Sequence, residues 1–208
     1  MSLKNTNLSD EFKYLIESGA GEEPLQKFLK QHPEILIRTF NQGSQYQVVF
    51  PKFRLATDFV PDFVMIGRRS GSKGTSWDGD LIEIEPAVFA KDSPLFNRRR
   101  QSTGNLRIAE AQIDDWKIWM QKYEQTIFVP KAFEQLKAKN AWNDHLEFYS
   151  PTVGTHQHMV VWYRIIIGRR KDFSGWGDEY RNLRRKEPGN RMEIVTWDRL
   201  LDMTKYLS

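Results

Sequence analysis

The chain has 208 residues, of which 39% are hydrophobic and 28% are charged, a composition typical of an ordinary soluble globular domain. It contains no cysteine, which excludes disulfides and thiolate-bound zinc. The formal charge is +4 and the sequence pI is about 9.2, and the basic residues are clustered, which favours an anionic partner.

The N-terminus lacks an apolar segment of signal-peptide length, and no apolar run is long enough to span a membrane, which takes about 18 residues. We therefore expect a cytoplasmic protein that has no membrane partner. Two short helices are expected first along the chain. One begins near Ser9 and ends at Gly19, and the next begins near Glu22 and ends before Pro33, because the residue before proline avoids helical geometry.

Three successive strands are expected after these helices. The first covers Gln45 to Leu55 with a break at Pro51, the second covers Val60 to Ile66, and the third lies around residues 80–86. A turn-rich loop, residues 67–79, joins the last two strands as a long hairpin, so the three strands form a meander.

The second half alternates helices and strands. A helix capped by Asn105 runs to about Tyr123, because apolar residues recur at three- and four-residue steps. Further elements are expected in this order: a helix over 131–140, a strand over 159–168, a basic helix over 178–186, a strand over 192–197 and a helix from 198. The strand at 159–168 is apolar on both faces, which places it inside a sheet. The strand-helix-strand order from here on predicts a parallel pair with the last strand.

We therefore predict one α/β domain with a mixed sheet, built as helix, three-strand meander, helix and strand, with added helices. Residues 1–20 are assigned to an N-terminal helical extension and residues 21–208 to the main domain.

Three carboxylates, those of Asp62, Glu83 and Glu85, lie on or next to the second and third expected strands. Glu83 and Glu85 share one face of their strand because side chains alternate. Asp62 lies on the neighbouring strand, so antiparallel pairing can bring it beside Glu83. Buried carboxylates are costly unless a partner binds them, and hard cations prefer such oxygens. The sequence therefore predicts a magnesium site, with Mn2+ as an alternative cation; the competing interpretation is strand-end acids paired with arginine or solvent.

The order of these elements, with Pro61-Asp62 and Glu83-Ile84-Glu85 in place, resembles the core of the PD-(D/E)xK nuclease superfamily, a restriction-endonuclease-like fold. More narrowly, the chain resembles the Shedu-type nuclease domain of bacterial anti-phage defence. The matching pieces are Leu25 to Pro33, Pro61 to Val64, Leu81 to Pro86, Ala109 to Trp116, Ile166 to Arg169, and Ile194 to Leu200.

The resemblance implies metal-dependent hydrolysis of DNA phosphodiesters, with Asp62 and Glu83 as metal ligands and Gln112 as a further catalytic residue. The chain departs from the family at Glu85, which stands where the family has its lysine. Glu85 could accept a proton from the attacking water or could be a further ligand, but it cannot supply positive charge. Lys91 or an arginine of the run 98–100 is a candidate for that charge.

Some relatives in the superfamily carry another acid on the first core helix that reaches the metal, and we assign this role to Glu23. The alternative is that Glu23 only places a favourable negative charge near the helix N-terminus. Clustered arginines are candidates for DNA phosphate contacts, which give affinity without sequence choice. These nucleic-acid-binding candidates are Arg98, Arg99, Arg100, Arg181, Arg184 and Arg185.

The first functional hypothesis is thus a magnesium-dependent DNA endonuclease. The absence of lysine at Glu85 supports an alternative, a catalytically inactive nuclease-fold module that binds nucleic acid or a partner protein. An α/β interaction domain without DNA binding is a third interpretation, and self-association into a homo-oligomer is compatible with all three.

Overall fold

The computed structural model describes residues 7–40, 43–57, 59–69, 76–89, 95–97, 99–138, 158–173, 175–187 and 189–207. Within this part of the chain, no helix is both long enough and apolar enough to cross a membrane.

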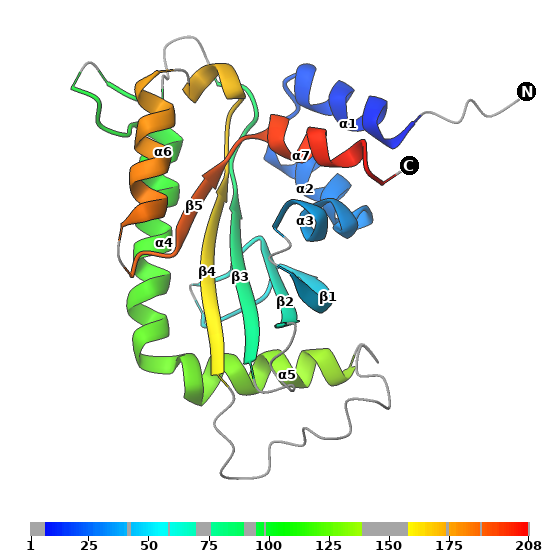
Figure 1. The fold of residues 1–208 in the computed structure, drawn as a ribbon, viewed down its shortest axis with the longest axis vertical. Coiled ribbons are helices and arrows are strands. Elements are labelled where there is room, and N and C mark those ends of the chain that lie inside the picture. The colour runs from blue at the N-terminus through cyan, green and yellow to red at the C-terminus, as the bar shows by residue number, and fades with distance from the viewer. Residues whose placement is uncertain are drawn as a thin grey trace, which may run out of the picture.

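A five-stranded mixed sheet forms the centre of the molecule, in the order β1-β2-β3-β4-β5 (Figure 1). The first three strands pair antiparallel, and β3, β4 and β5 pair parallel. The predicted meander and mixed sheet are therefore confirmed. The strands are β1 (Ser44–Pro51), β2 (Phe63–Arg69), β3 (Ser76–Ile84), β4 (His158–Ile166) and β5 (Met192–Val195).

The strand β4 lies between β3 and β5, as its two apolar faces predicted. Alternate residues face opposite layers: Val161 and Ile165 contribute to one hydrophobic cluster, whereas Ile166 contributes to the other. The parallel register pairs Ile82 with Arg164 and Glu83 with Ile165. Arg164 therefore shares a face with Ile82, and Glu83 faces the opposite layer.

One face of the sheet is covered by a long helical arm. This arm consists of α4 (Gly104–Tyr123), a π-helical turn (Glu124–Phe128) and α5 (Val129–Ala138). Buried residues of α4, including Leu106 and Ile113, pack in one cluster with Val64, Leu81 and Ile165 of the sheet. Trp116 and Trp119 are buried in this cluster, so both are core residues as the helical spacing predicted.

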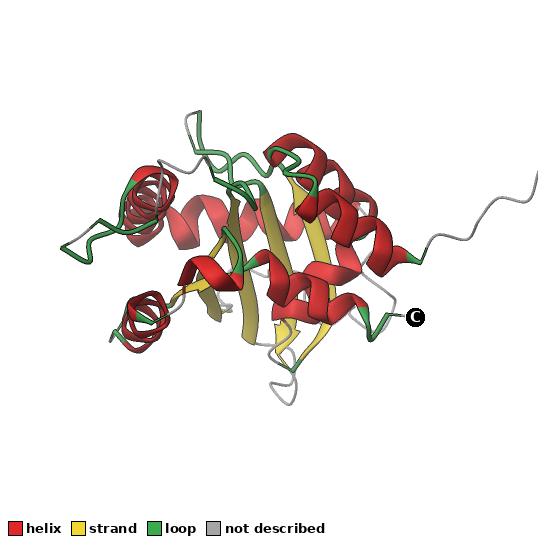
Figure 2. Cartoon of the chain, turned by 90° about the horizontal axis from the view of Figure 1, so that it is seen from above, coloured by secondary structure: helices red, strands yellow, loops and turns green. Residues whose placement is uncertain are grey.

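The other face carries the N- and C-terminal helices, so the sheet lies between two helical layers (Figure 2). The fully buried Trp197 connects the two chain ends, because its ring lies 6.1 Å from that of Phe12. Beside β5, α6 lies along the edge of the sheet (Figure 1). The elements are α1 (Leu8–Glu17), α2 (Glu22–Gln31), α3 (Pro33–Phe40), α6 (Trp176–Lys186), α7 (Trp197–Thr204) and a 3-10 turn (Arg170–Phe173).

Several local predictions were wrong. The helix α3 was missed, because Pro33 both ends one helix and opens the next, where its missing N–H costs no helical hydrogen bond. The helical arm does not break before Pro130, which stands in the first turn of α5, directly after the π-helical turn. Asn105 is not the cap of α4; the cap position is Thr103, and the side chain of Asn105 bonds elsewhere. Residues 53–55 are not a strand.

Candidate functional site

The structure brings Asp62 and Glu83 together. The antiparallel register pairs Phe63 with Ile82, which places the preceding Asp62 beside Glu83. The main-chain N–H of Ile84 donates to Oδ2 of Asp62 at 2.8 Å and fixes that carboxylate across the strand pair. Asp62 is 3% exposed and Glu83 is 8% exposed, so two acids meet in a nearly dry environment.

Glu85 is held one residue beyond the end of β3. Its main-chain N–H donates to the carbonyl of Ile166 (2.9 Å), and its carbonyl accepts from Nε1 of Trp197 (2.9 Å). Its carboxylate accepts a hydrogen bond from Nδ2 of Asn105, in the first turn of α4 (2.7 Å). Both the backbone and the side chain of Glu85 therefore have fixed positions.

The helix α2 adds an amide and a fourth acid. Nε2 of Gln26 donates to Oδ1 of Asp62 at 2.5 Å. Glu22 lies four residues earlier, on the same helix face, and acts electrostatically on Asp62, Glu83 and Glu85. The sequence-based assignment of this acid to Glu23 falls one residue away, because its neighbour Glu22 is the acid that couples to the cluster.

A lysine that the sequence analysis missed supplies the positive charge. Lys52 follows β1 with a left-handed backbone (φ +50°), and its N–H donates to the carbonyl of Asp62 (2.7 Å). Its Nζ forms an ion pair with Oδ1 of Asp62, and its side chain is 52% exposed. The signal that could have found it is strand register, because Pro51 pairs with Phe63 and the next residue must then face Asp62.

The carboxylate groups of this cluster outnumber its positively charged groups. Burial, together with the charges of the nearby Asp62 and Glu85, raises the pKa of Glu83 to about 9, against the opposing charge of Lys52. Burial also raises the pKa of Glu85 to about 7, although the hydrogen bond from Asn105 opposes this. Burial and the charge of Asp62 raise the pKa of Glu22. Four carboxylates thus face one lysine, and added positive charge would favour their ionised forms.

The pKa of Glu83 leads to a stability prediction. A carboxyl whose pKa is higher in the folded than in the unfolded state makes the metal-free protein less stable as pH rises from about 5 to about 9. Replacing Glu83 with Gln removes this titration. We expect Glu83→Gln to stabilise the protein by roughly 2 to 4 kcal/mol at pH 8, with little effect at pH 5.

Thermal unfolding in EDTA between pH 5 and 9 measures this effect. The matched control is Glu134→Gln on an exposed face of α5, which should leave the curve of the wild type unchanged. A Glu83→Gln protein that is less stable than the wild type at pH 8 would contradict the prediction.

The remaining predicted residues lie outside this cluster. Gln112 is exposed on α4, about two turns beyond Asn105, and Asn105 is the amide of this helix that bonds to the acids. Arg99 and Arg100 are exposed just before α4, and the guanidinium of Arg100 lies over the ring of Trp176 (5.1 Å). Arg98 and Lys91 lie outside the described residues.

The three arginines of α6 do not act as one face. Arg184 forms ion pairs with Glu110 on α4 (3.4 Å) and with Glu187 (3.1 Å). Arg181 and Arg185 instead line a cavity on the other side of α6. Arg184 is thus paired with acids while Arg181 and Arg185 border a cavity, and the contact of these arginines with DNA phosphates stays a prediction.

Few side chains of the carboxylate cluster are placed to act together as metal ligands. Among the described residues, no group of three or more histidine and carboxylate side chains is arranged so that it could hold a metal ion by itself. Asp62 and Glu83 are the two acids closest to this role, because the sheet register holds them side by side.

Comparison with models of known protein families shows the family of the chain. A model of the family described as Shedu protein SduA, C-terminal, matches residues 19–201. The chain belongs to this family. Shedu proteins form an anti-phage defence family, which agrees with the resemblance seen in the sequence. The matched range of this Shedu domain includes every residue of the carboxylate cluster, whereas α1 precedes it. No match was found among curated protein sequences.

Proposed function

We propose that this Shedu domain is a magnesium-dependent nuclease of the PD-(D/E)xK type that hydrolyses DNA phosphodiester bonds in defence against phage. The observation that supports it best is the convergence of Asp62, Glu83, Glu85 and Glu22 with one lysine at the end of two paired strands. Buried like charges at such density are typical of catalytic sites.

Magnesium fits this donor set. Mg2+ prefers carboxylate oxygens and commonly uses one or two of them, completing its shell with water and substrate phosphate. Asp62 and Glu83 offer two such carboxylates, and the surrounding excess of negative charge favours a divalent cation. The same chemistry would accept Mn2+.

Asp62 and Glu83 would hold the cation. Bound there, it would supply Lewis acidity to the attacking water and positive charge to the phosphate. Gln26 and the N–H of Ile84 each bond one oxygen of Asp62 and so fix the plane of its carboxylate. This preorganisation stabilises developing charge without reorganisation during the reaction.

Glu85 is the best candidate for the general base. Its pKa of about 7, raised by burial, lies near neutral pH, where a base combines a large ionised fraction with useful basicity. The hydrogen bond from Asn105 holds the carboxylate in one orientation. An ionised glutamate at this position can therefore accept a proton, which a positively charged lysine cannot do.

Lys52 would supply the positive charge that Glu85 cannot. Its Nζ forms an ion pair with Oδ1 of Asp62, and its half-exposed side chain remains accessible to a phosphate group arriving from solvent. The exposed Arg99 and Arg100, which precede α4 in the chain, are candidates to contact the DNA backbone. Such contacts would hold DNA without reading its sequence.

A plasmid-nicking assay with Mg2+ or EDTA, run beside a salt-titrated DNA-binding assay, tests the proposal. We expect conversion of supercoiled plasmid to nicked and linear forms with Mg2+ and none in EDTA. Salt-sensitive binding without turnover in Mg2+ or Mn2+ would identify an inactive DNA-binding module instead. Loss of both activities would identify an interaction domain that does not bind DNA.

A further inference from the structure

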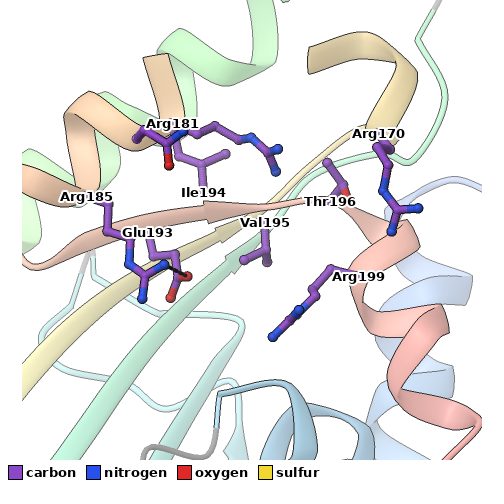
Figure 3. A pocket seen from close by; sticks show the side chains of 9 residues that line it. Arg170, Arg181, Arg185, Glu193, Ile194, Val195, Thr196 and Arg199 are labelled. Carbon is purple, nitrogen blue, oxygen red and sulfur yellow. Dashed lines mark ion pairs between the residues drawn. The ribbon is translucent and has the colours of Figure 1, made fainter. Parts of the chain in front are cut away.

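A second polar site lies on the face of the sheet opposite the carboxylate cluster. It consists of two neighbouring cavities of about 320 Å³ each between α3, β5, α6 and α7, and Arg185, Glu193 and Arg199 line both of them. Figure 3 shows one of the two cavities. We call the two cavities together the arginine groove. Arg164, which lines one of them, shares its sheet face with Ile82 and not with Glu83, so the groove is separate from the proposed active site.

The floor of the groove is a buried guanidinium. Arg164 is 1% exposed and lies between the rings of Phe40 (5.1 Å) and Trp162 (4.7 Å). Its Nε donates to Asp80 at 2.7 Å, and its Nη1 forms an ion pair with Glu193.

Two hydrogen-bond donors at this floor have no acceptor. Within the described part of the chain, neither Nη2 of Arg164 nor Nε1 of Trp162 has a hydrogen-bond partner. A buried donor without an acceptor costs about 1–3 kcal/mol. Both residues line the same cavity, so a ligand that presents oxygen acceptors there could satisfy them after small side-chain movements.

The walls of the groove carry more positive than negative charge. Glu193 is the sole carboxylate among the residues that line the two cavities, and five arginines surround it: Arg164, Arg170, Arg181, Arg185 and Arg199. Two of them have other acids as partners, because Arg170 pairs with Asp202 and Arg181 with Asp178. Figure 3 shows that Arg170, Arg181 and Arg199 come from three different elements around one cavity.

Arg185 and Arg199 are the least compensated of the set. The closest carboxylate to Arg185 is Glu193 at 3.8 Å, and the side chain of Arg185 is 64% exposed. Arg199 is exposed, and no ion pair joins it to another described residue. These two guanidinium groups, on α6 and α7, line both cavities and are the arginines of the groove with the weakest carboxylate pairing.

We propose that the arginine groove binds a small ligand with two or more phosphate groups, such as a nucleoside di- or triphosphate. Guanidinium forks match phosphate oxygens in a bidentate manner, and arginines spread over two joined cavities suit more than one phosphate. The buried floor favours a small ligand over a DNA duplex, whose backbone cannot descend to Arg164.

Isothermal titration calorimetry on the full chain in EDTA, with pyrophosphate and ATP as probes, tests this proposal. We expect saturable binding of both probes and weaker binding of inorganic phosphate. The double variant Arg185→Ala/Arg199→Ala should bind both probes at least about tenfold more weakly, because two charge-assisted contacts are lost. Both side chains are exposed, so the variant should keep the thermal unfolding midpoint of the wild type.

The control variant is Arg107→Ala, an exposed arginine on α4 at the other face of the sheet, which should bind both probes like the wild type. The nuclease-site variant Asp62→Asn should also bind them normally, so this result is independent of the proposed nuclease function. The proposal fails if the wild type does not bind pyrophosphate or ATP, or if the double variant binds them unchanged. It also fails if a 5′-phosphorylated oligonucleotide occupies the groove and excess pyrophosphate does not displace it.

Discussion

Asp62→Asn is expected to reduce magnesium-dependent plasmid nicking by on the order of 10³-fold. The substitution keeps the shape of the side chain and an oxygen for the N–H of Ile84, but it removes one of the two charged groups proposed to hold the cation. Charge stabilisation by a catalytic metal is worth several kcal/mol, and each 1.36 kcal/mol corresponds to about a tenfold change in rate. Initial nicking rates over a Mg2+ titration measure the loss.

The control for this experiment is Asp114→Asn, an exposed aspartate on α4 that pairs with Lys117 and lies away from the cluster. It should nick plasmid at the rate of the wild type. Glu83→Gln should be as inactive as Asp62→Asn, while circular dichroism shows that both variants are folded. If Asp62→Asn and Glu83→Gln cut as fast as the wild type, the assignment of the metal site is wrong.

Arg164→Met is expected to give the largest loss of stability of any single substitution considered for this domain, about 3–5 kcal/mol at pH 8. Arg164 is the cation that pairs with the buried Asp80 and with Glu193, and removing one member of a buried ionic group leaves uncompensated charge. Methionine fills a similar space between the two flanking rings, so the loss is mainly electrostatic. Urea unfolding followed by circular dichroism measures it.

The pH dependence of this loss tests its cause. Burial raises the pKa of Asp80 to about 6, even with the opposing charge of Arg164. Without Arg164 this pKa rises further, so the folded variant takes up a proton and loses stability as pH increases above the unfolded value of about 4. The loss should therefore be smaller at pH 5 than at pH 8.

Two variants serve as controls for this interpretation. Arg164→Met/Asp80→Asn should recover part of the stability, because the uncompensated carboxylate is gone. Arg185→Met, at an exposed position of α6, should change stability by less than about 0.5 kcal/mol. An Arg164→Met protein that is nearly as stable as the wild type at pH 8 would show that the buried ion pairs do not stabilise the fold.

Much of the sheet could be predicted because its signals are local. The apolar runs of β2, β3 and β4, and the turn-rich sequence that joins the first two of them, indicate strands and an antiparallel pair without knowledge of the rest of the chain. Alternation along β3 then places Glu83 and Glu85 on one face. The helix α3 was missed because Pro33 is compatible with both a helix end and a helix start.

The sequence by itself determined the mixed sheet and the meeting of Asp62 with Glu83, because strand periodicity is visible over a few neighbouring residues. It also determined the family, because the order of the motifs along the chain is a property of the sequence alone. Only the tertiary structure decided which other groups surround those acids. Lys52 can be placed only through the register of β1 and β2, and Glu22 and Asn105 come from helices far apart in the chain whose approach no local pattern specifies. Burial, which sets the pKa of each carboxyl and leaves two donors unsatisfied at the arginine groove, arises only when both helical layers close on the sheet.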